Sequence, residues 1–168
     1  MDERLMPIFF RRSVREYLDK PVDEKDIVAL LEAGMAAPSA RNLKPWDFIV
    51  ITSQELLRQM AEIHPAGKML NQAPLAIAVC GNKGVSPSFW VQDGAAAAEN
   101  ILIAAAMLGL GAVWLGVYPR EEREMHLKKL LGVPENFGLL CVISVGVPKV
   151  KPEPRTQFDP SRVHRDRW

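Results

Sequence analysis

The residue types that could do chemistry gather first near the N-terminus, in the segment RRSVR. Arg11, Arg12, Ser13 and Arg15 fall within five residues of one another. If the segment is extended, Arg11, Ser13 and Arg15 share one side of the chain, because side chains alternate along a strand. Two guanidinium forks and a hydroxyl on one side suit a phosphate group. A solvated basic patch, balanced by the acidic residues that follow, is the alternative that this segment alone leaves open.

A second set of donors lies in the stretch APSARNLKPWDFIV, where polar residues and prolines run directly into an apolar strand. It offers Ser39, the backbone of Ala40, Arg41 and Asn42, and Arg155 in the C-terminal tail is a third candidate. Hydrogen bonds to charged groups contribute roughly 1.5 to 3 kcal/mol each, so two or three arginines supply about 4 to 8 kcal/mol. Micromolar affinity needs about 8 kcal/mol after ordering costs. A ligand with a flat apolar body beside its phosphate would supply the remaining binding free energy.

Other common sites are missing from the sequence. The histidines His64, His126 and His164 lie far apart without cysteines or carboxylates at metal spacing, so we predict no metal site and expect each histidine at the surface or in the tail. Neither a nucleophile elbow nor a phosphate-binding P-loop occurs. Gly109 and Gly111 follow a helix and precede a strand, the reverse of a dinucleotide loop, so we interpret them as a helix C-cap and a turn glycine.

Composition narrows the class of protein. The 168 residues carry 21 basic and 20 acidic side chains, a net charge of +1, which favours neither nucleic acid nor an anionic membrane as partner. One domain spanning residues 1–168 is expected for this length. Cys80 and Cys141 lie within apolar runs and are interpreted as core residues of a reduced protein, which we place in the cytoplasm.

The hydrophobic pattern predicts an intermixed set of helices and strands. Helices are expected over residues 2–10, 22–35, 54–63, 89–108 and 121–131, and strands over 47–52, 75–80, 112–117 and 139–147. Asp23 is a good N-cap, and residues 52–55 form a capping-box pattern. Few strand-helix-strand units follow one another, which favours an α+β fold over a doubly wound sheet.

Two segments suggest a second subunit. The helix over residues 89–108 is apolar on nearly every face, so it must be covered all round, either as one central core helix or at a subunit interface. The tail over residues 148–168 is polar and proline-rich and cannot pack a core of its own. It is either disordered or laid across another surface.

Four segments together resemble the FMN-dependent nitroreductase family, in one of its short forms. They are RRSVREY, PSARNLKPWDF, AAENILIAAAMLGLGAVWLGVYP and VGVPKVKPEPR, in the family's order and across nearly the whole chain. The resemblance implies a central, mostly antiparallel sheet flanked by helices. It also implies a homodimer in which the long apolar helix forms the interface and the tail wraps the partner.

The resemblance also implies which residues bind FMN. One subunit would supply its N-terminal segment, a lysine near a flavin carbonyl, backbone beside the flavin's hydride-accepting nitrogen and a phosphate-binding tail arginine. These residues are Arg11, Arg12, Ser13, Arg15, Lys68, Leu115, Gly116 and Arg155. The other subunit would supply Pro38, Ser39, Ala40 and Asn42.

The implied activity is a ping-pong transfer of reducing equivalents from NADH or NADPH through FMN to a small oxidant such as a nitroaromatic or a quinone. No side chain stands out as acid or base, so the chemistry would be the cofactor's. Two alternatives stay open: other flavin chemistry, such as reductive dehalogenation or dehydrogenation of a metabolite, and a non-catalytic module that stores or senses FMN. Lys44 stands where many members have glutamine, and the 81–89 region is too short for a lid, so the acceptor does not follow from the resemblance.

Overall fold

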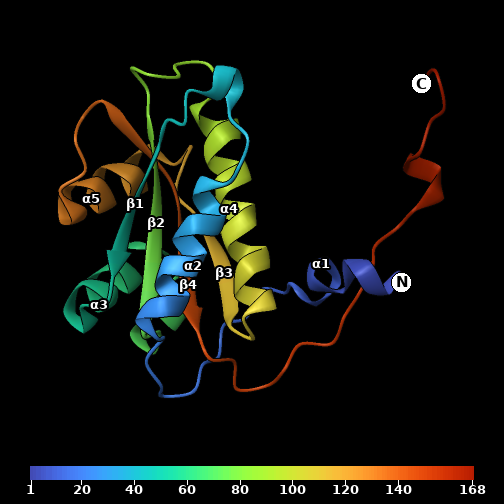
Figure 1. Ribbon diagram of the computed structural model, residues 1–168. Helices are drawn as coiled ribbons and strands as arrows, with labels where there is room; N and C mark the ends of the chain where they lie inside the picture. The colour runs from blue at the N-terminus through green and yellow to red at the C-terminus, as the bar shows by residue number, and fades with distance from the viewer.

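A four-stranded antiparallel sheet lies at the centre of the computed structural model, which describes residues 1–168 (Figure 1). Its strands are β1 (Trp46–Ile51), β2 (Leu75–Asn82), β3 (Gly111–Gly116) and β4 (Phe137–Gly146). They are arranged in the order β1-β2-β4-β3, and every neighbouring pair is antiparallel. The predicted α+β class with a mostly antiparallel sheet is therefore confirmed.

Helices cover both faces of this sheet. One face packs against α2 (Glu24–Met35) and α4 (Trp90–Met107), and the other against α3 (Gln54–Ile63) and α5 (Glu121–Leu131). Alternate residues of β2 divide between the two cores: Ile77 and Val79 join the α2–α4 core, whereas Ala76 and Ala78 join the α3–α5 core. This double burial explains why the strand is an unbroken apolar run rather than an alternating one.

The expected elements match the structure, with small differences at their ends. The expected helix over residues 2–10 consists of a 3₁₀ turn, Glu3–Leu5, followed by α1 (Met6–Phe10). The N-cap of α3 is Ser53, one residue after the Thr52 that the capping-box pattern implies, and its Oγ accepts the N–H of Leu56 at 3.4 Å. Asp23 occupies the N-cap of α2, but its side chain makes no capping bond. The sequence pattern missed three further 3₁₀ turns, Ala40–Asn42, Lys68–Asn71 and Pro160–Arg162.

Helix α4 is covered on one side only. Ala97, Ala98 and Ile101 are fully buried against the sheet and α2, whereas Ile103 is half-buried and Met107 is 67% exposed. The single chain therefore does not surround this helix, as the alternative of a central core helix required. No helix of the chain is both long enough and apolar enough to cross a membrane.

The C-terminal tail leaves the body of the molecule beside α1, as Figure 1 shows. The tail pairs with the N-terminal region through the N–H of Arg155, which donates to the carbonyl of Phe9 at 3.1 Å. Lys151 lies over the ring of Phe10, with its Nζ 5.5 Å from the ring centre. After Arg155 every residue of the tail is exposed, and Phe158 is 76% exposed. Wrapping of a partner by this tail stays a prediction.

Candidate functional site

The outer edge of β3 organises the site. The N–H of Val14 donates to the carbonyl of Ala112 at 3.0 Å, and the N–H of Val117 donates to Leu140 in β4 at 3.0 Å. Because backbone groups alternate along a strand, the even-numbered residues of β3 present their N–H and C=O groups away from β4. The edge is therefore occupied by the N-terminal segment at Ala112 and lies open to a ligand farther along, toward Gly116.

A glycine allows the N-terminal segment to lie this close. A Cβ built on Gly111 would stand 2.6 Å from Cγ1 of Val14, too close for any real side chain. Gly111 is the first residue of β3, so our interpretation of it as a turn glycine is wrong: it serves close approach of two backbones. Gly109 does follow the end of α4 with φ of 74°, as a C-cap glycine should.

The predicted phosphate-binding residues separate into two groups. Arg12, Ser13 and Arg15 line a hollow of about 440 Å³. The tail forms its other wall, and the charged residues around it are Arg12, Arg15, Glu16, Lys149, Lys151 and Glu153. Arg12 is fixed there, because its Nη1 donates to the carbonyl of Glu153 at 2.9 Å. Arg11 instead points toward α4, with its Nε 3.4 Å from Oε1 of Glu99. The hollow is thus predominantly basic without Arg11.

The Ser39–Lys44 loop is held under backbone strain. Arg41, Asn42 and Lys44 have φ of 54°, 56° and 49°, a left-handed conformation that costs non-glycine residues roughly 1 kcal/mol or more each. The hydroxyl of Ser39 accepts the N–H of Lys44 at 2.9 Å. The N–H of Ala40 donates to Oδ1 of Asp93 at 2.8 Å, so this donor of the loop is already used within the chain.

Asp93 is a residue that the sequence pattern gave no reason to select. It lies in the first turn of α4, is 5% exposed, and accepts a second hydrogen bond from the hydroxyl of Ser86 at 3.2 Å. A buried carboxylate with two donors ties the strained loop to the start of the helix. Asp93 stands at the start of an alanine-rich apolar helix, and no local pattern there indicates that its carboxylate binds a distant loop.

We expect Asp93→Ala to lower the free energy of unfolding by about 1 to 3 kcal/mol, because the partly buried N–H of Ala40 and the buried hydroxyl of Ser86 lose their acceptor. Asp93→Asn keeps an oxygen acceptor for Ala40 and is expected to lose less. Urea unfolding of both variants measures the difference. Equal losses for alanine and asparagine would show that the bond to Ala40 does not hold the loop.

The loop and the N-terminal segment lie at opposite ends of α4, as Figure 1 shows. The loop is bonded to Asp93 near the start of the helix, whereas Val14 packs on Gly111, just past its end. At a rise of 1.5 Å per residue, the fifteen residues from Asp93 to Leu108 span about 22 Å. The donor sets of one chain are therefore too far apart to close around one phosphate, which agrees with the expected sharing of the site between two subunits.

At the far end of β3, two side chains converge on the carbonyl of Gly116. Nη1 of Arg123 donates to it at 2.6 Å, and Nε2 of His64 contacts it at 2.9 Å. Since a carbonyl only accepts, Nε2 of His64 carries the proton. Nδ1 is then free to accept the N–H of Ala66, which lies 3.2 Å away. His64 is 4% exposed, so our expectation of a surface histidine is wrong.

The three residues predicted near the flavin ring, Leu115, Gly116 and Lys68, differ in what they offer a ligand. The backbone of Leu115 faces β4 and its side chain is buried, so it presents nothing to the outer edge. A Cβ built on Gly116 would meet only Nε1 of Trp114, at 3.8 Å, which leaves room for a flat ligand. Lys68 is exposed on the segment that follows His64 and makes no hydrogen bond or ion pair.

His64 gives stability a pH dependence. Burial lowers the pKa of His64, and the nearby charge of Arg123 lowers it further. The folded protein thus binds this proton less tightly than the unfolded chain, whose histidine pKa is about 6.5. We expect the unfolding free energy contributed by His64 to be fully present above pH 6.5 and to fall as the pH drops through the lowered value. Urea unfolding at several pH values between 5 and 8 measures this dependence. In His64→Gln the unfolding free energy should vary less with pH than in the unaltered protein. The same pH dependence in both proteins would contradict a role for His64.

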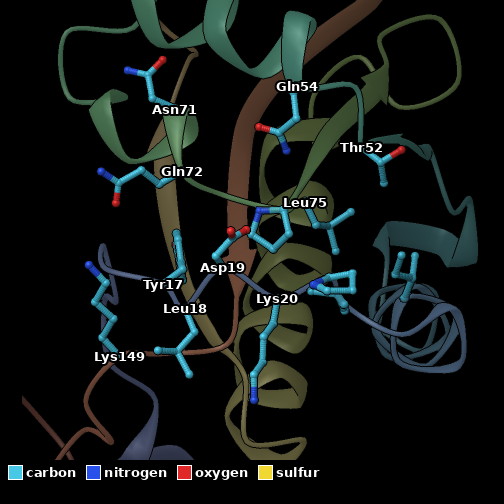
Figure 2. A pocket seen from close by; sticks show the side chains of 14 residues that line it. Tyr17, Leu18, Asp19, Lys20, Thr52, Gln54, Asn71, Gln72, Leu75 and Lys149 are labelled. Carbon is cyan, nitrogen blue, oxygen red and sulfur yellow. The ribbon is translucent and has the colours of Figure 1, made fainter.

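The largest cavity lies elsewhere and contains none of the predicted binding residues. It measures about 800 Å³ and lies near the start of β2 (Figure 2). The polar groups around it include Asp19, Lys20, Gln54, Gln72 and Lys149, which do not form a cationic cluster. Lys149 is the residue that this cavity shares with the basic hollow. Size alone therefore does not mark the anion site. No group of three or more histidine, cysteine or acidic residues could hold a metal ion.

A model of the nitroreductase family matches residues 8–66 and 63–147 of the chain. A relative from Archaeoglobus fulgidus, a candidate NADH dehydrogenase/NAD(P)H nitroreductase, is 48% identical over 174 residues, covering 100% of both chains. A crystal structure of a protein with the same description from Parabacteroides distasonis superposes with a TM-score of 0.96 at 41% identity and covers 100% of both chains. A nitroreductase-type protein from Desulfovibrio desulfuricans, solved in complex with FMN, superposes with a TM-score of 0.84 at 27% identity, covering 100% of this chain and 99% of that one.

Proposed function

Because this chain belongs to the nitroreductase family, we propose that it is an FMN-dependent oxidoreductase working by a ping-pong mechanism on NADH or NADPH and a small oxidant such as a nitroaromatic or a quinone. Bound FMN would supply the redox chemistry, taking up reducing equivalents from the nicotinamide and passing them to the oxidant. Everything else is the task of the protein: to bind the cofactor, to orient it and to hold charge beside it.

The basic hollow is the observation that carries the proposal. Arg15, Lys149 and Lys151 make no ion pair within the chain, although they line one hollow with the fixed guanidinium of Arg12. Four basic side chains against the two carboxylates of Glu16 and Glu153 leave the hollow with excess positive charge, so a dianionic phosphate would be attracted and could accept several charge-assisted hydrogen bonds. The donor set therefore fits the phosphate of FMN.

The rest of the FMN molecule would run along β3. From Ala112, where the N-terminal segment pairs, to Gly116 is four residues, or about 13 Å of strand. Over that length the N–H and C=O of Trp114 and the N–H of Gly116 face away from β4, and the edge ends beside a glycine with open space. An extended ligand with phosphate at one end and a flat ring at the other suits this arrangement.

A second copy of the chain would complete the site with its Pro38–Asn42 loop. The loop is held by two hydrogen bonds within its own chain, to Asp93 and to the Ser39 hydroxyl, which would lower the entropy cost of presenting Ser39 and Asn42 to a neighbour. The half-exposed side of α4 and the projecting tail are the surfaces available for such a homodimer. A site shared between two subunits would explain why the two donor sets of one chain lie at opposite ends of α4.

The visible absorption spectrum of the purified protein tests the proposal. We expect a yellow protein that releases one FMN per chain on heating, loses its colour on anaerobic addition of NADH or NADPH, and regains it on addition of a quinone. Initial rates with both substrates varied should give parallel reciprocal plots, as ping-pong kinetics require. FMN that stays coloured with both nicotinamides would favour a storage or sensing module, and a protein that refuses FMN would refute the assignment.

A further inference from the structure

The C-terminal end of β3 has an arrangement that cofactor binding alone does not explain. Gly116 is the last residue of the edge strand, and its carbonyl points away from β4. Two donors from different elements meet on that oxygen, Nη1 of Arg123 from α5 at 2.6 Å and Nε2 of His64 from the end of α3 at 2.9 Å. A carbonyl at a sheet edge can accept hydrogen bonds from water. Two protein donors on this one oxygen are therefore not needed merely to satisfy it.

Holding both donors on this oxygen costs free energy. Nε of Arg123 is buried without any hydrogen-bond partner, which costs free energy. Nη1 of Arg123 also lies 3.4 Å from Nε2 of His64, and both atoms carry protons, so they do not bond to each other. The side chains are thus held close together, at a cost, by the oxygen that they share.

The two donors fix the position of the Gly116 peptide, and Arg123 also places a positive charge beside it. Glycine has wide backbone freedom, and a glycine at a strand end is prone to turn. Fixing its carbonyl fixes the following peptide and keeps Gly116 extended, with its N–H on the open edge. The guanidinium of Arg123 adds a permanent positive charge behind the peptide, whereas His64 in the tautomer described is neutral.

We infer that His64 and Arg123 are positioning residues that clamp the Gly116 carbonyl, and that the charge of Arg123 makes this end of β3 favour the more negative, reduced form of the bound cofactor. The inference rests on the proposed function, because it requires the flavin ring at this end of β3. His64 directly follows α3 and Arg123 lies in α5, so both are outside every segment selected for cofactor binding.

The test compares oxidised and reduced FMN in the same variants. We expect Arg123→Gln to weaken binding of reduced FMN about tenfold more than that of oxidised FMN, equivalent to a fall of about 30 mV in the potential of the bound couple. Arg123→Lys keeps the charge and should restore most of the difference. His64→Gln keeps an N–H donor and should leave the ratio near that of the unaltered protein. Anaerobic spectroelectrochemical titration measures these potentials.

The outcomes separate the clamp from the proposed function. If the unaltered protein binds no FMN, the function itself fails before any variant is made. If FMN binds and Arg123→Gln leaves the ratio unchanged, the electrostatic inference is overturned. Amide hydrogen exchange at Val117 in the FMN-free protein reports on the clamp alone: faster exchange in Arg123→Gln supports it, and equal exchange refutes it. Arg123→Met provides the same loss of charge should the glutamine variant fail to fold.

Discussion

Replacing Arg12 and Arg15 together by alanine is expected to weaken FMN binding about a thousandfold. Each guanidinium contributes roughly 2 kcal/mol through charge-assisted hydrogen bonds to the phosphate, and 4 kcal/mol corresponds to about three decades in affinity. Arg12 is already oriented by the carbonyl of Glu153, and Arg15 lines the same hollow without an acidic partner. Fluorescence titration of the apoprotein with FMN measures the loss.

The matched control removes two positive charges outside the hollow, by Arg58→Ala and Lys129→Ala on exposed parts of α3 and α5. It should keep nearly unaltered affinity, because exposed charges at this distance are screened by salt. Arg11→Ala should cost less than either hollow arginine, since Glu99 already engages its guanidinium. Equal losses in the double variant and the control would mean that net charge, and not the hollow, attracts the cofactor.

Deleting residues 153–168 is expected to convert a dimer into monomers and to abolish stoichiometric FMN binding. The deleted residues bury almost nothing in their own chain, so the body should keep its fold. They do hold Arg12 through the carbonyl of Glu153, and they are the segment that projects beyond the body. Sedimentation velocity measures the assembly, and circular dichroism checks the fold.

A milder version of the same test changes Phe158 alone. Its ring is 76% exposed in the single chain, and burying it against a partner would contribute about 1.5 to 3 kcal/mol. Because a symmetric dimer buries two such rings, Phe158→Ser should weaken it by about 3 to 6 kcal/mol, or roughly two to four decades in dissociation constant. A truncated protein that stays dimeric with FMN bound would contradict wrapping by the tail.

Local patterns in the sequence were sufficient for most of the fold. The apolar runs of β2 and β4 and the Ser53 cap of α3 depend on residues that are close together in the chain. Such signals set element type well and element ends less well, which is why β2 extends to Asn82 beyond the expected end. Even the α+β class followed from the order of elements, before any pairing was known.

The site was harder to predict because its geometry depends on distant pairs. Arg11 reaches Glu99, 88 positions along the chain, and no local pattern could separate it from Arg12 or Arg15. His64 follows an amphipathic helix and precedes a proline, a context typical of an exposed turn, yet it is buried beneath Gly116. Arg123 lies in the strongly charged EEREMH run, where a solvated residue is the normal expectation.

If one FMN site is built from two chains, a mixed dimer of two complementary variants should restore it. One subunit carries Arg12→Ala and Arg15→Ala, the other carries Asn42→Asp, and different affinity tags allow the mixed dimer to be isolated after coexpression. Each variant alone should bind no stoichiometric FMN. The mixed dimer should recover about one FMN per dimer, because one of its two sites combines the intact halves of both chains. A mixed dimer as empty as its parents would contradict a shared site.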